Sequence, residues 1–76
     1  MRSLSTLILY MKSGCPLCRE AEEALAEAGL AYAARDILED PELYARYRYR
    51  IPVLARDGVD LVEGRAFDPN ALRRLQ

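Results

Sequence analysis

The order of apolar and charged positions near the start of the chain predicts a strand followed by a helix. Residues 6–11 are almost wholly apolar and carry no charge, which is typical of a short strand buried on both faces. From Cys15 to Ala28, apolar residues recur every three or four positions with charged residues between them, and this spacing predicts an amphipathic helix. Pro16 suits the first turn of that helix, and Gly29 suits the position just after its end.

The remaining sequence predicts two more helices and three more strands. Residues 30–37 favour a second strand, although their alanines weaken the pattern. Later, two apolar segments flank Asp57 and Gly58, a dipeptide that favours a tight turn between antiparallel strands. An aspartate that can cap a helix, followed by a proline suited to its first turn, occurs twice: Asp40-Pro41 and Asp68-Pro69.

The predicted order is strand–helix–strand–helix–strand–strand–helix. The first strand–helix–strand unit places its two strands parallel with a right-handed crossover, and the hairpin adds two antiparallel strands. We therefore expect an α/β protein with a mixed four-stranded sheet flanked by helices, the arrangement of the thioredoxin fold. With 76 residues the chain has room for one core, so we expect residues 1–76 to form a single domain.

Composition narrows the classes of function. Eleven basic residues against twelve acidic ones give no basic excess, which argues against a nucleic-acid partner. No apolar stretch approaches the ~20 residues of a membrane span, and no secretory signal is recognisable. We therefore expect a cytoplasmic monomer that contacts neither nucleic acid nor membrane. In such a protein a cysteine pair is more often catalytic or metal-binding than a structural disulfide.

The candidate chemistry lies in Cys15-Pro16-Leu17-Cys18, where the first strand passes into the first helix. A helix N-terminus offers unpaired N–H groups and a partial positive charge, which favour a thiolate over a thiol at Cys15. Lys12 adds a cationic charge nearby. Cys18 is one turn further along, within reach to attack a mixed disulfide on Cys15, and it falls on the apolar stripe of the helix.

The two cysteines allow two other interpretations. A tetrahedral zinc site needs four ligands, whereas the chain has two cysteines and no histidine, so we expect no metal. Cysteines that merely pack in the core do not explain the neighbouring Gly14 and Pro16. The redox interpretation is favoured. An iron–sulfur cluster bridged by Cys15 of two chains, and an interaction module without redox activity, remain the alternative functions.

Three further places in the sequence each have a functional and a structural interpretation. Pro52 either opens an edge strand or follows a cis peptide bond, which would present the backbone N–H and C=O of Ile51 to a substrate peptide. The alternating Arg and Tyr residues of 46–50 either bind an anion or end a helix, with the tyrosines folded onto the core. The second interpretation is favoured for 46–50. Asp68 either caps the last helix or precedes a helix start that binds a carboxylate ligand, and the capping role is favoured.

These residues resemble the glutaredoxins. Residues 9–18 are similar to the active-site entry of that family, in which a tyrosine, a nearby lysine and a CPYC motif recur. Residues 50–52 resemble its Thr-Val-Pro segment, whose proline is cis. The hairpin and the aromatic-Asp pair Phe67-Asp68 extend the resemblance to short bacterial glutaredoxin-like proteins, over nearly the whole chain.

The resemblance implies a dithiol–disulfide oxidoreductase in which Cys15 is the nucleophile and Cys18 the resolving thiol. Lys12 would approach the thiolate or a carboxylate of glutathione. The remaining residues expected to contact substrate are Pro16, Leu17, Ile51 and Pro52.

The resemblance also implies partners: protein disulfides or glutathione mixed disulfides as substrates, and no permanently bound cofactor. Three features depart from the family pattern. Arg50 replaces a threonine, Leu17 replaces a tyrosine, and a Gly-Gly-Asp segment that holds glutathione retains only Gly64. The sequence therefore leaves glutathione and thioredoxin reductase open as the source of electrons.

Overall fold

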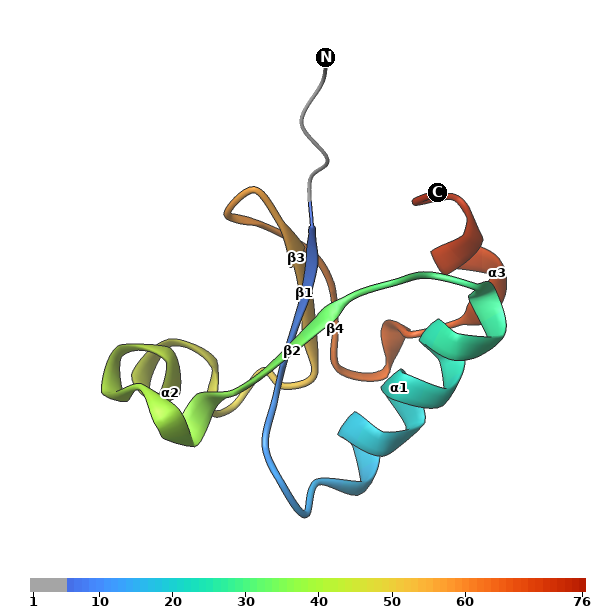
Figure 1. Cartoon of the computed structure of the whole chain (residues 1–76). Helices are drawn as coiled ribbons and strands as arrows, with labels where there is room; N and C mark the ends of the chain where they lie inside the picture. The colour runs from blue at the N-terminus through green and yellow to red at the C-terminus, as the bar shows by residue number, and fades with distance from the viewer. Residues whose placement is uncertain (1–5) are drawn as a thin grey trace.

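A four-stranded sheet separates two layers of helices in the computed structural model, which describes residues 6–76. Helices α1 (Pro16–Ala28) and α3 (Pro69–Arg73) cover one face of the sheet. Helix α2 (Pro41–Tyr47) lies on the opposite face (Figure 1). The arrangement confirms the predicted fold class, an α/β protein with a mixed sheet between helices.

The sheet has the strand order β2-β1-β3-β4. Its strands are β1 (Leu7–Met11), β2 (Ala33–Asp36), β3 (Val53–Arg56) and β4 (Val59–Glu63). β1 pairs parallel with β2 and antiparallel with β3, and β3 pairs antiparallel with β4. The carboxyl ends of β1, β2 and β4 therefore meet the amino end of β3 at one edge of the structure.

Each predicted helix start is confirmed, as is the end of α1 before Gly29, and each has a local cause. All three helices start with a proline that follows an N-cap residue: Cys15 for α1, Asp40 for α2 and Asp68 for α3. The side chain of Asp68 accepts the backbone N–H of Ala71 at 3.1 Å, as the capping interpretation predicted. α1 ends at Ala28 because Gly29 adopts a φ of 75°, a conformation that costs glycine little.

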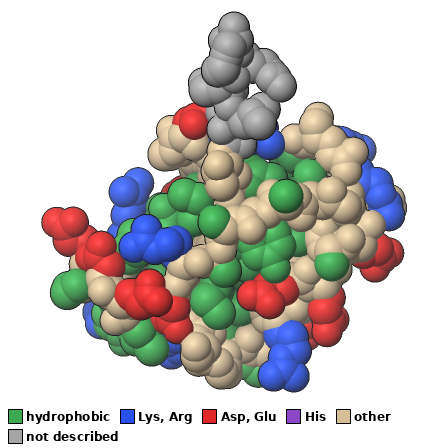
Figure 2. Space-filling model, viewed as in Figure 1, with side chains coloured by type: hydrophobic (Ala, Val, Ile, Leu, Met, Phe, Trp, Pro, Cys, Tyr) green, Lys and Arg blue, Asp and Glu red, His purple; other side chains and the backbone are tan. Residues whose placement is uncertain are grey.

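The second strand is shorter than predicted. It spans only Ala33–Asp36, and a short 3₁₀ helix, η1 (Ile37–Glu39), follows at once. The side chain of Asp36 accepts the N–H of Leu38 at 2.9 Å and thereby starts η1 instead of prolonging the strand. β2 is also an edge strand, and most of its residues are exposed. On the face of the molecule shown in Figure 2, hydrophobic side chains lie near the middle with charged side chains around them.

The hairpin between β3 and β4 forms as predicted. Asp57 has a φ of 54° and Gly58 a φ of 79°, the two left-handed conformations of a type I′ turn. The pairing is irregular, because Leu54 faces Val62 while Ala55 faces Asp60. Leu61 is thus an extra residue on β4, a β-bulge that alters which way the neighbouring side chains point. A second 3₁₀ helix, η2 (Gly64–Ala66), follows β4.

The core consists of two clusters, one on each face of the sheet. The larger lies beneath α1 and α3 and contains Leu7, Leu9, Ala24, Leu25, Ala28, Leu54 and Leu72. The smaller lies beneath α2 and contains Ile37, Tyr47 and Val53, with Tyr10 packed against it. The prediction that β1 is buried on both faces is therefore only partly right. Leu7 and Leu9 are fully buried, whereas Ile8 and Tyr10 are half-buried on the face of the short α2.

Truncation of the central core should be costly. Leu9 is 0% exposed, whereas Leu38 is 60% exposed. We expect Leu9→Ala to lower the free energy of unfolding by about 2–5 kcal/mol through lost burial and a cavity. The matched variant Leu38→Ala should change it by less than about 0.5 kcal/mol. Urea denaturation measures both, and equal losses in the two variants would contradict this packing.

Candidate active site

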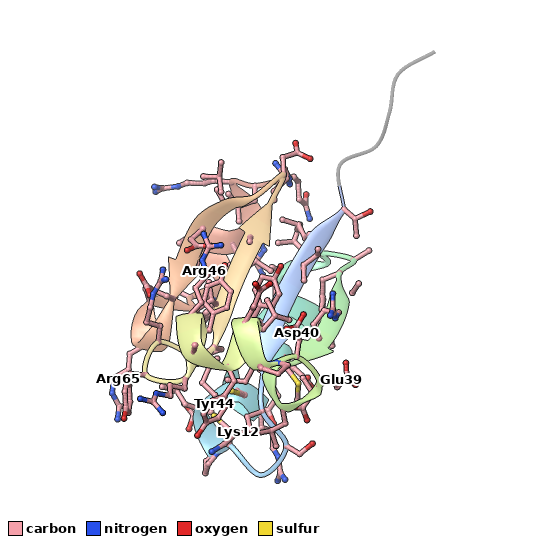
Figure 3. All side chains as sticks on the ribbon, turned by 90° about the vertical axis from the view of Figure 1, so that its left-hand side faces the viewer. Lys12, Glu39, Asp40, Tyr44, Arg46 and Arg65 are labelled. Atoms are coloured by element: carbon pink, nitrogen blue, oxygen red, sulfur yellow. The ribbon has the colours of Figure 1, made fainter. Side chains whose placement is uncertain are left out.

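The candidate site lies at the edge where the carboxyl ends of β1, β2 and β4 meet the start of β3. The segment that joins β1 to α1, residues 12–15, leaves the sheet here. In Figure 3, Lys12, Tyr44 and Arg65 all lie toward this edge, although they come from three different segments. Side chains from several elements therefore lie toward this edge of the sheet.

Cys15 occupies the N-cap position of α1 and uses its sulfur as the cap. Its Sγ accepts the backbone N–H of Cys18 at 3.1 Å, and its carbonyl accepts the N–H of Arg19 at 3.2 Å. The residue has extended dihedral angles, φ −93° and ψ 110°, as an N-cap requires. The half-buried sulfur faces the positive end of a helix dipole, where a negative charge is stabilised.

Cys18 lies one turn further along α1 in a very different environment. The residue is 2% exposed. Burial, together with a side-chain hydrogen bond to Cys15, raises the pKa of Cys18 to about 12, although a hydrogen bond from the Lys12 backbone opposes the shift. Both cysteines are free thiols. The site therefore pairs a half-exposed sulfur that receives an N–H with a buried sulfur that keeps its proton.

A cleft of about 500 Å³ opens beside the two sulfurs. It is lined by residues 11–16 and by four residues of α1: Cys18, Arg19, Glu20 and Glu22. Its charges are mixed, because Lys12 and Arg19 face it together with the two glutamates. Of the residues predicted to contact substrate, Lys12 and Pro16 line this cleft, and Leu17 does not.

Ile51 and Pro52 also lie outside the lining of the cleft. The peptide bond between them is cis. The pairing of Tyr10 with Val53 places Pro52, one residue before Val53, at the level of Met11 and hence at the edge that carries the cysteines. The predicted backbone ledge needs one correction. The N–H of Ile51 donates to the carbonyl of Tyr47 at 3.1 Å and so is already used within the chain.

The arginine–tyrosine stretch 46–50 divides into residues with different environments. Tyr47 is 3% exposed and stacks on Tyr10 with ring centroids 4.5 Å apart, as the favoured interpretation predicted. That interpretation is wrong for Tyr49, which is 86% exposed because the chain turns just after α2. The anion-binding alternative does not fit Arg50, since its guanidinium is paired with Asp60 at 2.7 Å and with Glu63 at 2.8 Å.

This pairing forms a polar network that the sequence did not reveal. The hydroxyl of Tyr47 donates to Asp60 at 3.0 Å. Burial tends to raise the pKa of Asp60, but hydrogen bonds from Arg50 and Tyr47 outweigh it and hold the pKa below its usual value. In a regular strand, positions 60 and 63 point to opposite faces. The bulge at Leu61 lets both carboxylates reach Arg50, two residues before the cis proline.

A second contact missed by the sequence touches the site directly. The carboxylate of Asp36 accepts both the backbone N–H of Ser13, at 3.3 Å, and its hydroxyl, at 2.9 Å. Ser13 is two residues before Cys15. The partners are 23 positions apart, and only the observed strand pairing of Met11 with Asp36 brings them together.

Within residues 6–76, no group of three or more His, Cys, Asp or Glu side chains is arranged to hold a metal ion. None of the helices in that region combines the length and apolar character that crossing a bilayer requires.

A thioredoxin-type fold with a Cys-x-x-Cys pair at the head of its first helix defines the class of this protein. A family model described as Glutaredoxin-like domain (DUF836) matches residues 6–75. The chain therefore belongs to the glutaredoxin-like domain family, and the resemblance noted from the sequence is confirmed.

Solved structures agree with this membership. The chain is similar to the structural-genomics target protein XcR50 from X. campestris, whose X-ray structure matches with 35% identity and a TM-score of 0.81, over 92% of this chain and 93% of that one. It is also similar to the solution structure of a glutaredoxin from Brucella melitensis. That match has 26% identity and a TM-score of 0.65, over 97% of this chain and 84% of the other.

The network around Asp60 should make stability depend on pH. Because its folded pKa lies below the unfolded value of ~3.9, its contribution is present above pH ~4 and is lost as pH falls through the folded value. We expect Asp60→Asn to lower the free energy of unfolding by about 1–3 kcal/mol at neutral pH. The difference from wild type should shrink on acidification. Urea denaturation across pH measures it, with Glu23→Gln as an exposed control; a difference that is constant with pH would refute the linkage.

Proposed function

We propose that the chain is a thiol–disulfide oxidoreductase in which Cys15 attacks disulfides and Cys18 resolves the intermediate. The observation that carries the proposal is the asymmetry of the two sulfurs. Cys15 Sγ receives an N–H at the head of α1, whereas Cys18 is buried one turn behind it. Membership in the glutaredoxin-like family supports the same chemistry.

In the first step, the Cys15 thiolate attacks one sulfur of a substrate disulfide. A bond forms between Cys15 Sγ and that sulfur, the substrate S–S bond breaks, and the other substrate sulfur leaves as a thiolate. The N–H of Cys18 stabilises the attacking charge before the reaction. The half-exposed position of Cys15 beside the cleft admits the substrate.

In the second step, Cys18 loses its proton and attacks Cys15 Sγ. The Cys15–Cys18 bond forms, the mixed disulfide breaks, and the second substrate sulfur departs as a thiolate. The substrate has gained two electrons and the protein has lost two. An external thiol reductant then returns the pair to the dithiol, either as two glutathione molecules or as a thioredoxin reductase system.

The proposal also covers the residues that contact the substrate, the class of substrate and the state in which the protein acts. Lys12 and Pro16 contact the substrate from the cleft, and Leu17 and Ile51 contact it from the neighbouring surface. The side chain of Pro52, which the sequence predicted to contact substrate, is fully buried, so this residue shapes the backbone beside the site and does not itself touch the substrate. The substrates are protein disulfides or glutathione mixed disulfides, and no cofactor remains bound. We propose further that residues 1–76 act as one cytoplasmic domain and as a monomer.

Substitution of each cysteine tests the two roles. We expect Cys15→Ser to abolish reduction of a protein disulfide, because no nucleophile remains. Cys18→Ser should still attack but stop as a mixed disulfide on Cys15, which mass spectrometry detects. Turnover is followed with glutathione and, in parallel, with thioredoxin reductase as electron donor. A Cys15→Ser variant that retains wild-type turnover would contradict the proposal.

The resolving step should accelerate with pH. Burial, the largest cause of the raised pKa of Cys18, persists in the mixed disulfide. The thiolate fraction of Cys18 then rises about tenfold per pH unit well below its pKa. We expect the rate of release of a chromophoric thiol from a preformed Cys15 mixed disulfide to rise steadily from pH ~7 to ~10. A rate that levels off near pH ~7 would show that Cys18 ionises easily and would refute this assignment.

A further inference from the structure

We propose that Asp36 is a positioning residue for Cys15: its carboxylate holds the turn between β1 and α1 so that the Cys15 sulfur is aimed at an incoming disulfide. This inference rests on the proposed thiol–disulfide exchange. Asp36 itself stands at the end of β2, on the far side of β1 from the hairpin, and it takes no part in bond making or breaking.

The register of the sheet delivers Asp36 to the turn. Asp36, the last residue of β2, is paired with Met11, the last residue of β1. The backbone pairing of β1 with β2 ends at this point. Beyond it, the side chain of Asp36 forms hydrogen bonds with the turn. Its Oδ2 accepts the hydroxyl of Ser13 at 2.9 Å and the backbone N–H of Ser13 at 3.3 Å. One carboxylate oxygen thus holds both the backbone and the side chain of the residue that leads to Gly14 and Cys15.

The turn has few other constraints. Inside it, the N–H of Cys15 donates to the carbonyl of Lys12 at 3.2 Å, and Gly14 adopts a φ of 84°. Within residues 6–76, Asp36 provides the only side-chain hydrogen bonds to Ser13 from another part of the chain. Packing of α1 on the core fixes Cys15 from its carboxyl side, and the bonds from Asp36 fix it from its amino side.

A carboxylate suits this place because it must accept several donors at once. Its second oxygen, Oδ1, accepts the N–H of Leu38 at 2.9 Å. The hydrogen bonds from Leu38 and Ser13, with the nearby charge of Lys12, keep the pKa of Asp36 below its usual value. Asp36 therefore remains an anion throughout the neutral pH range, and the tie to the turn does not depend on pH there.

Position matters for the proposed reaction because the attacking sulfur must approach along the axis of the substrate S–S bond. Displacement of a reacting group by about 1 Å can reduce a rate by up to ~10²-fold. Alkylation by a small reagent such as iodoacetamide makes a weaker demand on orientation, although it needs the same thiolate. Loss of the tie should therefore slow attack on a disulfide far more than it slows alkylation.

The test compares these two reactions in variants that weaken the contact between Asp36 and the turn, with or without loss of the bond between Asp36 and Leu38. Ser13→Ala removes a bond to the turn but leaves Asp36 bonded to Leu38. Asp36→Ala removes both, and Ser13→Thr restores the hydroxyl. Asp40→Ala is the matched control, because Asp40 caps α2 in the same way, by accepting the N–H of Glu42 at 2.9 Å, without a hydrogen bond to the turn.

We expect Ser13→Ala and Asp36→Ala to lower the second-order rate constant for reaction with glutathione disulfide by about tenfold. The rate constant for alkylation by iodoacetamide should change by less than about twofold in both variants. Ser13→Thr and Asp40→Ala should keep the wild-type ratio of the two rates, even where urea denaturation shows lower stability. An unchanged ratio in Asp36→Ala, or an equal fall of both rates, would overturn the role of Asp36. Failure of wild-type protein to react with the disulfide would instead overturn the proposed function.

Discussion

One hydrogen bond organises the candidate site: the N–H of Cys18 donates to the sulfur of Cys15 at 3.1 Å. Every α-helix needs acceptors for its first N–H groups, and α2 and α3 obtain one from an aspartate side chain. In α1 a sulfur takes the place of that carboxylate. The N–H that the start of this helix must satisfy is therefore directed at the sulfur that we propose as the nucleophile. Helix formation and thiol reactivity therefore share one contact.

The rest of the fold holds this contact in place. The sheet brings β1, β2, β3 and β4 to a common edge, and polar side chains tie the segments beyond the strands. Asp36 ties the β2 end to the turn before Cys15, and Arg50 ties the segment before the cis proline to the carboxylates of β4. One turn further along α1, Cys18 is buried against the core, an environment that disfavours a charged sulfur. Two chemically identical side chains thereby acquire different burial and different hydrogen bonds.

Local signals in the sequence were sufficient for most of the fold. Cap-plus-proline pairs located α2 and α3, periodicity located α1, and the Asp57-Gly58 turn located the hairpin, because each depends on neighbouring residues. The observed β2 is shorter than its sequence predicts, because the hydrogen bond that the N–H of Leu38 donates to Asp36 competes with strand pairing.

Contacts between distant segments were not predictable in the same way. The bond between Asp36 and Ser13 depends on the register of parallel strands, and the pairing of Arg50 with two carboxylates depends on a bulge. Neither feature leaves a pattern among adjacent residues.

The direct test of the unequal sulfurs is an NMR pH titration of the reduced protein with ¹³C-labelled cysteines assigned by Cys→Ser variants. Cys18 should stay protonated into the alkaline range; a Cys18 signal that titrates near ~8.5, as a free thiol does, would contradict the proposed roles.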